Sequence, residues 1–126
     1  MNPKKKILIV DDEPDVQTYL STLLEDHGYA TVLAKDGEEA LSKIKEGLPD
    51  LVTLDISMPQ KSGVRFYRDM KENPSWKQVP VLIVTGVSED FKKFISTRKQ
   101  VPPPEGYLSK PIDPEEMLGL VKKLTA

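Results

Sequence analysis

Cysteine is absent from this sequence of 126 residues, and histidine occurs only once. Without cysteine the chain forms no disulfide, performs no thiolate chemistry and builds no zinc–sulfur site. No stretch approaches the roughly 20 apolar residues of a membrane-spanning helix, and the amino terminus lacks the apolar region of a signal peptide. A net charge of −2 gives no electrostatic reason to expect direct binding of nucleic acid. We therefore expect a soluble, cytoplasmic protein that binds neither membrane nor nucleic acid directly.

The composition is that of one globular domain. Hydrophobic residues make up 38% of the chain and charged residues 30%, a balance typical of a fold with a buried core and a solvated surface. A chain of 126 residues buries roughly two-thirds of its unfolded surface in a single domain. We expect no effector domain after Ala126. Residues 1–126 are therefore expected to act as one domain through contacts with other proteins, unless the sequence is an excised fragment.

Strand and helix patterns alternate along the chain. Five short apolar runs predict buried strands at residues 7–10, 30–34, 51–54, 81–84 and 106–109. Apolar residues at helical spacing follow each run, and helix-start signals stand at Pro14, Asp36, Ser88, Asp113 and Pro114. Asp36 and Glu39 resemble an acid-headed capping box. The alternation predicts an α/β fold, a doubly wound (βα)5 flavodoxin-like domain with five parallel strands ordered 2-1-3-4-5 and helices on both faces.

Polar and charged residues stand where the predicted strands end. The first strand is followed by Asp11 and Asp12, the third by Asp55, the fourth by Thr85 and the fifth by Lys110. Since the carboxyl ends of parallel strands share one edge of a sheet, where ligands bind, these groups are expected to meet there. Three ionised carboxylates at one edge require a cation, most simply Mg²⁺, which accepts oxygen ligands and retains waters. Taken alone, the acidic Asp12–Glu13 pair is equally well explained as a cap for the following helix.

The same set of groups suits phosphoryl transfer. With Mg²⁺ beside it, an ionised Asp55 can act as a nucleophile toward phosphorus and form an aspartyl phosphate. Such a transfer depends on positioning and on the neutralisation of charge. Mg²⁺ would contact one phosphoryl oxygen, the Lys110 ammonium a second, and the Thr85 hydroxyl a third. The expected catalysis is limited to the chain's own Mg²⁺-dependent phosphorylation and dephosphorylation, without turnover of an external substrate.

Four motifs resemble the receiver domains of two-component response regulators, of the stand-alone, single-domain kind. They are VDDEP at residues 10–14, LDISMP at 54–59 with Gly63, VTG at 84–86 and YLSKP at 107–111. The resemblance spans essentially the whole chain. It implies that Asp55 accepts a phosphoryl group from a histidine kinase or phosphotransfer protein, or from a small acyl phosphate. The metal ligands that it implies are Asp11, Asp12, Asp55 and a backbone carbonyl in the region of Ile56 or Ser57.

The resemblance also implies a conformational switch. Thr85 and Tyr107 match a pair in which the threonine moves toward the phosphoryl group and the aromatic ring turns inward behind it. The change is expected to reach a surface around the fourth helix, the fifth strand and the last helix, where a downstream protein target binds. Without the motif, Tyr107 is interpreted as an ordinary half-buried aromatic of an edge strand. Pro111 matches a position where the family carries a cis peptide bond after Lys110.

One segment departs from the family pattern. Residues Val101 to Glu105, with three consecutive prolines, replace the small-residue turn that usually precedes the fifth strand. The prolines stiffen a connection that borders the expected output surface, which leaves the choice of partner and the size of the switch open. Ser57 and Val87 lie at positions where the family tunes the lifetime of the phosphoryl group.

Two other functions stay open from the sequence. A small aspartate-dependent phosphatase would use the same nucleophile, but such enzymes pair it with an acid two residues later, where this chain has Ser57. A binding module of the same fold that is never phosphorylated is disfavoured by the complete set of acids, threonine and lysine. Flavin or nucleotide binding is disfavoured because an acidic loop follows the first strand and no glycine-rich phosphate cradle is present.

Overall fold

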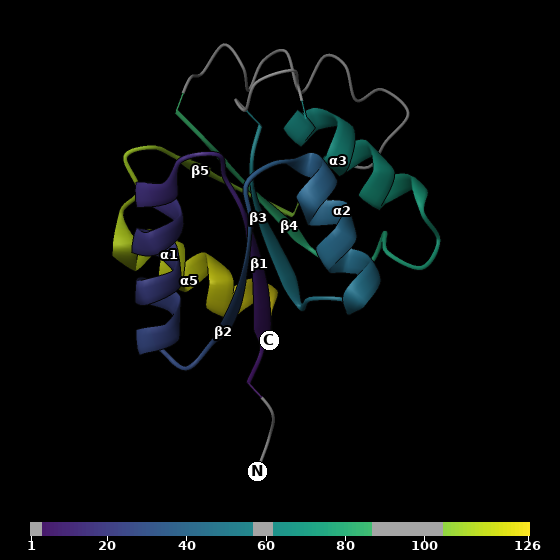
Figure 1. The fold of residues 1–126 in the computed structure, drawn as a ribbon. Coiled ribbons are helices and arrows are strands. Elements are labelled where there is room, and N and C mark those ends of the chain that lie inside the picture. Colours follow the sequence, from purple (N-terminus) through teal and green to yellow (C-terminus); the bar gives the residue numbers. More distant parts are fainter. Residues whose placement is uncertain (1–3, 57–61, 87–104) are drawn as a thin grey trace.

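A computed structural model describes residues 4–56, 62–86 and 105–126 (Figure 1). Its strands are β1 (Lys6–Val10), β2 (Ala30–Ala34), β3 (Leu51–Asp55), β4 (Val81–Thr85) and β5 (Gly106–Ser109). Its helices are α1 (Pro14–Asp26), α2 (Gly37–Glu46), α3 (Ser62–Glu72) and α5 (Pro114–Leu124). The strands form one parallel sheet in the order β2-β1-β3-β4-β5, which confirms the predicted fold class. The helix expected after Ser88 lies outside the described residues.

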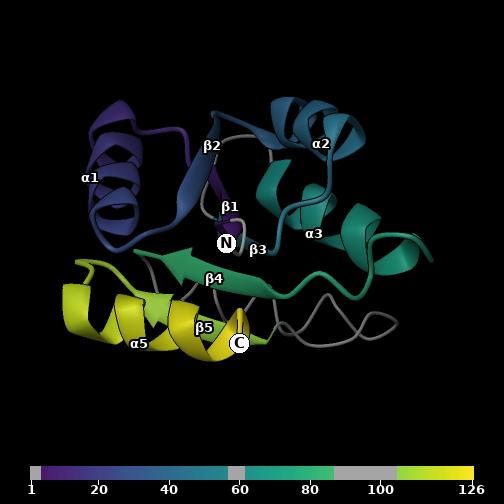
Figure 2. The same ribbon diagram turned by 90° about the horizontal axis from the view of Figure 1, so that it is seen from below.

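The sheet is covered on both faces. Helices α1 and α5 lie against one face, and α2 and α3 lie against the other (Figures 1 and 2). Side chains of β1 alternate between the two layers: Ile7 and Ile9 pack with α1 and α5, whereas Leu8 and Val10 pack with α2 and α3. Because both faces are buried, residues 7–10 of the strand are consecutive apolar residues without polar alternation.

Three strands are one residue longer than the apolar runs predict. The ladder begins at Lys6, which pairs with Ala30, and β3 and β4 extend through Asp55 and Thr85. Asp55 pairs with Val84 in the neighbouring strand. The backbones at positions 55 and 85 are therefore fixed by sheet hydrogen bonding, although their polar side chains mark the end of the apolar pattern.

The predicted helix caps are largely observed. Asp113 accepts hydrogen bonds from the Glu115 and Glu116 amides at 2.9 and 3.5 Å. Asp36 accepts one from the Glu39 amide at 2.8 Å. The reciprocal half of the capping box is different from the prediction, because the Glu39 carboxylate accepts from the amide of Lys35 at 2.9 Å, one residue before the cap.

A buried lysine joins α3 to the start of β5, which the sequence pattern did not predict. The side chain of Lys71 is 1% exposed, and its Nζ lies 2.6 Å from Oε1 of Glu105. The same ammonium donates to the carbonyls of Lys77 and Val79, both at 3.2 Å. Oε2 of Glu105 accepts from the Val81 amide at 2.7 Å. One ion pair therefore ties together α3, the loop before β4 and the residue before β5.

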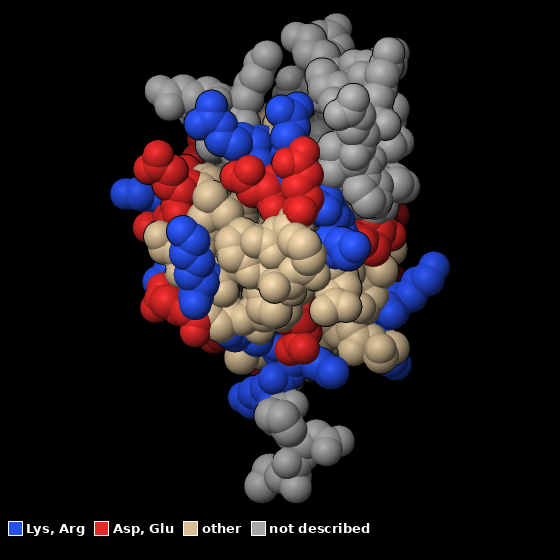
Figure 3. Space-filling model, turned by 90° about the vertical axis from the view of Figure 1, so that its right-hand side faces the viewer, with Lys and Arg blue, Asp and Glu red and all other residues tan. Residues whose placement is uncertain are grey.

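The helices in the described part of the chain include none that is long and apolar enough to cross a membrane. Figure 3 shows the side of the molecule that α2 and α3 cover. A broad uncharged area there is bordered by both acidic and basic side chains. Neither sign of charge dominates this face.

Candidate functional site

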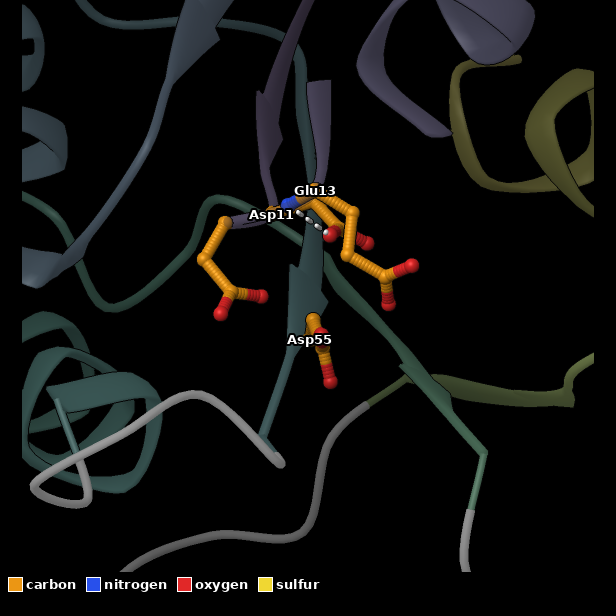
Figure 4. A group of neighbouring side chains, drawn as sticks. Asp11, Glu13 and Asp55 are labelled. Atoms are coloured by element: carbon orange, nitrogen blue, oxygen red, sulfur yellow. Dashed lines mark hydrogen bonds between the residues drawn. The ribbon is translucent and has the colours of Figure 1, made fainter. Parts of the chain in front are cut away.

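The strand ends bring two buried aspartates and a lysine together. Asp11 directly follows β1, Asp55 ends the adjacent strand β3, and both residues are 2% exposed. Lys110, which follows β5, places its Nζ 3.0 Å from Oδ2 of Asp11 and 3.3 Å from Oδ2 of Asp55. Figure 4 shows the two aspartates converging at this edge of the sheet, together with Glu13. Asp11 and Lys110, which are 99 residues apart along the chain, thus share one pocket.

Asp11 is held by residues of β2 and of the start of α1. Its amide donates to the Ala34 carbonyl at 3.0 Å, and its Oδ1 accepts from the Glu13 amide at 2.9 Å. The side-chain amide of Gln17 donates to the carbonyls of Asp11 and Ala34, at 2.8 and 2.9 Å. Gln17 thereby joins α1 to the ends of both strands and fixes the backbone from which the Asp11 carboxylate projects. No pattern in the sequence marks this glutamine as part of the site.

Gly63 allows the backbone of Asp55 and Ile56 to pass close to the first turn of α3. A Cβ atom at this position would collide with the carbonyl oxygen of Asp55 and would lie 3.0 Å from the Cα of Ile56. Only a residue without a side chain fits so close to the backbone that carries the Asp55 carboxylate. Gly63, which the resemblance included, therefore has a steric role at the site.

Four carboxylates meet the chemical requirements of a magnesium site. Each of Asp11, Asp12, Glu13 and Asp55 offers an oxygen, and these oxygens all lie within 4.8 Å of one another. Asp11 and Asp55 are buried, whereas Asp12 and Glu13 are exposed. A hard cation with oxygen ligands fits this donor set, and receiver domains generally bind Mg²⁺ at such an acidic pocket. The residues present therefore fit the implied ion.

The capping interpretation of the acidic triplet does not account for Glu13. Glu13 is the N-cap residue of α1, yet its side chain makes no capping hydrogen bond. Its carboxylate instead lies 3.3 Å from Nζ of Lys110. Glu13 is thus a member of the pocket that the predicted set of site residues did not include.

The electrostatics of the pocket are dominated by this single ammonium among acids. Burial raises the pKa of Asp11, and this effect outweighs the opposing hydrogen bonds from Glu13 and Lys110. Burial by itself would lower the pKa of Lys110, but the hydrogen bond to Asp11 and the charges of Asp55 and Asp11 raise it above its ordinary value. The lysine is therefore firmly protonated and can serve as a fixed positive charge.

The other predicted site residues are placed in part. Thr85 ends β4, with its backbone paired to Ser109, and Tyr107 lies on the edge strand β5 with 38% of its surface exposed. The peptide bond between Lys110 and Pro111 is cis. Ser57, expected near the metal, lies outside the described residues.

A doubly wound parallel sheet in the order 2-1-3-4-5, with its polar pocket at the carboxyl edge, defines the class of flavodoxin-like α/β domains. Residues 7–122 match the family model of the response regulator receiver domain. The chain therefore belongs to the response regulator receiver family.

The chain is similar to some known proteins over most of their length and to others over about half of it. The chain is 36% identical over 121 residues to protein Rrf1 of Nitratidesulfovibrio vulgaris, covering 96% of this chain and 83% of that protein. It is 35% identical over 120 residues to the alkaline phosphatase synthesis transcriptional regulatory protein PhoP of Bacillus subtilis. That match covers 95% of this chain but only 48% of PhoP. The structure of the chemotaxis response regulator CheY4 of Vibrio cholerae superposes with a TM-score of 0.83 at 31% identity, covering 97% of this chain and 99% of CheY4.

Proposed function

We propose that this chain is a phosphorylation switch of a cytoplasmic two-component pathway in which Asp55 is the acceptor. The donor is a phosphohistidine of a histidine kinase or phosphotransfer protein, or a small acyl phosphate. The observation that carries this proposal is the contact of the Lys110 ammonium with both Asp11 and Asp55, at 3.0 and 3.3 Å. A carboxylate suited to act as a nucleophile, acids suited to bind a metal ion and an ammonium suited to bind phosphate lie in one pocket, which supports the proposal.

The transfer follows from these positions. An oxygen of Asp55 forms a bond to phosphorus while the bond from phosphorus to the donor's imidazole nitrogen breaks, and that nitrogen keeps the electron pair. Mg²⁺, bound by Asp11, Asp12 and Asp55 with a carbonyl near Ser57, would supply positive charge to the transferring group. The Lys110 ammonium leaves the carboxylate of the acceptor and binds a phosphoryl oxygen.

The switch in this proposal runs along β4 and β5. The Thr85 hydroxyl binds a phosphoryl oxygen, and Tyr107 turns from the exposed edge of the sheet into the space that the threonine leaves. The two residues lie on adjacent strands, where Ile83 pairs with Tyr107 and Thr85 with Ser109. The altered surface comprises β5, α5 and the segment after Ser88, and it binds a downstream protein target.

An open pocket beside the site gives a protein donor a surface to contact. Its volume is about 250 Å³, and it is lined by Asp15, Val16, Tyr19, Lys110, Pro111 and Ile112. Because Lys110 belongs to both this pocket and the acidic site, a donor seated against α1 would face Asp55. A small acyl phosphate does not need this surface, so Tyr19→Ala should slow only transfer from a protein donor.

Intact-protein mass spectrometry after incubation with acetyl phosphate tests the proposal. With Mg²⁺ the protein should gain one phosphoryl group and lose it slowly, and chelation of the metal should prevent the gain. Asp55→Asn should abolish it, whereas Asp15→Asn, a change at an exposed aspartate on α1, should retain it. An equal signal from the Asp55 variant would exclude this acceptor. Repeated hydrolysis of acetyl phosphate without accumulation would identify a phosphatase instead.

A further inference from the structure

Lys110 has a third acidic partner that the proposed transfer does not use. Oε1 of Glu13 lies 3.3 Å from the Lys110 Nζ, the same distance as Oδ2 of Asp55. The side chain of Glu13 is 60% exposed, whereas those of Asp11 and Asp55 are 2% exposed. The ammonium therefore sits between two buried carboxylates and one at the mouth of the pocket.

Binding of a metal ion should affect the three contacts of Lys110 differently. Asp11 and Asp55 are proposed metal ligands, so a bound cation competes directly with Lys110 for both carboxylates. Glu13 belongs to the same cluster of four carboxylates, but we assign its carboxylate to Lys110, which it already contacts at 3.3 Å, and not to the metal. In the metal-loaded protein, Glu13 is thus the acidic group with which an incoming phosphoryl oxygen has to compete for Lys110.

The geometry around Glu13 indicates a specific contact with Lys110, which a surface carboxylate with no fixed orientation would not make. Its backbone amide is fixed by the hydrogen bond to Oδ1 of Asp11, at 2.9 Å. The side chain leaves the N-cap position of α1 without bonding to that helix. Both features direct the carboxylate across the pocket toward the lysine that follows β5.

We propose that Glu13 is a positioning residue. It holds the Lys110 ammonium at the mouth of the pocket and thereby weakens the binding of Lys110 to the phosphoryl group. The inference rests on the proposed function, since it concerns the phosphoryl-bound state of the same site. Exposed ion pairs of this kind are weak, so removal of the Glu13 carboxylate should tighten binding of a phosphoryl analogue by about two- to fivefold.

The test compares binding of beryllofluoride, an analogue of the phosphoryl group, at saturating Mg²⁺ in wild type and in Glu13→Gln, which keeps the size of the side chain. We expect the two- to fivefold gain in affinity with a change of less than about threefold in the affinity for Mg²⁺ alone. Glu38→Gln is the matched control. It makes the same change at an exposed glutamate in the first turn of α2, and Glu38 is not an ion-pair partner of Lys110 among the described residues.

A double substitution shows whether Glu13 acts through the lysine. In a Lys110→Met background, Glu13→Gln should leave beryllofluoride affinity unchanged, as measured by ¹⁹F NMR at high analogue concentration. A gain that persists without the lysine, or one equal to that of Glu38→Gln, would overturn the inference. So would a loss of Mg²⁺ affinity of tenfold or more, because Glu13 would then be a metal ligand.

The same measurements distinguish a wrong role for Glu13 from a wrong function for the whole site. If wild type binds beryllofluoride and takes up one phosphoryl group while Glu13→Gln behaves like its control, only the role of Glu13 is wrong. If wild type binds no beryllofluoride with Mg²⁺ present, the proposed function fails and the role of Glu13 fails with it.

Discussion

Replacing Glu105 by glutamine should destabilise the protein more than removing the buried lysine that it contacts. Glu105→Gln keeps the Lys71 ammonium in a site where its side chain is 1% exposed, and it removes the negative charge 2.6 Å away. A buried charge that loses its partner costs about 3 kcal/mol. The amide oxygen still accepts a hydrogen bond, which keeps the cost at this lower end of the range.

Lys71→Met has a smaller expected cost because it removes the buried charge itself. The Glu105 side chain is 33% exposed and can be rehydrated, and the apolar stem of methionine fills the space of the lysine chain. The remaining penalty comes from the carbonyls of Lys77 and Val79, which lose their donor. The Lys77 contact is only part-buried, so water can replace the lost donor there, and the one buried acceptor, at Val79, costs about 1 to 2 kcal/mol.

Urea unfolding monitored by circular dichroism measures both variants, and hydrogen exchange adds a local readout. The Val81 amide donates to Glu105 at 2.7 Å, so its exchange should accelerate in Glu105→Gln beyond the global loss of stability. A greater loss in Lys71→Met than in Glu105→Gln would refute this reasoning. So would losses below about 0.5 kcal/mol in both, as expected for surface substitutions.

Two further predictions concern the pocket. Gly63→Ala should cost about 1 to 3 kcal/mol and weaken Mg²⁺ binding, because its Cβ would displace the backbone of Asp55. Gly119→Ala, a control in α5 with open space around its Cβ, should stabilise by about 0.5 to 1 kcal/mol, and urea unfolding with Mg²⁺ titration measures both. In the metal-free protein, Lys110→Met should raise the pKa of Asp11 further, since the lysine lowers it, and carboxyl ¹³C NMR follows this titration. A lower Asp11 pKa in the variant would contradict this effect of the lysine. The native Asp11 binds its proton more tightly than the unfolded chain does, so its contribution to stability falls as pH rises above 3.8.

The sheet and the main site residues could be predicted because each left a local signal. Apolar runs of four or five residues marked the strands, and a polar residue closed the first, third, fourth and fifth of them. Parallel topology then carried Asp11, Asp55 and Lys110 to one edge without any knowledge of the tertiary contacts. The predicted carboxyl ends of β3 and β4 were one residue short because Asp55 and Thr85 are polar, although their backbones continue the ladder.

Residues whose roles depend on distant partners could not be predicted. Lys71 is a charged residue of α3, and the sequence there predicts an exposed side chain. It is buried because it forms an ion pair with Glu105, which lies 34 residues later in the chain. Gln17 contacts two strand ends through one amide, a geometry with no signature in the spacing of residues. Glu13 was visible as an acid at a helix start, but its contact with Lys110 depends on the position of β5.

The central claim is that a metal ion and a phosphoryl group share one pocket at Asp55. Calorimetric titration of Mg²⁺ with and without saturating beryllofluoride tests it, because two ligands in one pocket must change each other's affinity by the same factor. We predict that each ligand tightens the other, and that Asp55→Asn abolishes this coupling. Mg²⁺ affinity that is unchanged by beryllofluoride, or coupling that survives in the Asp55 variant, would contradict the shared pocket.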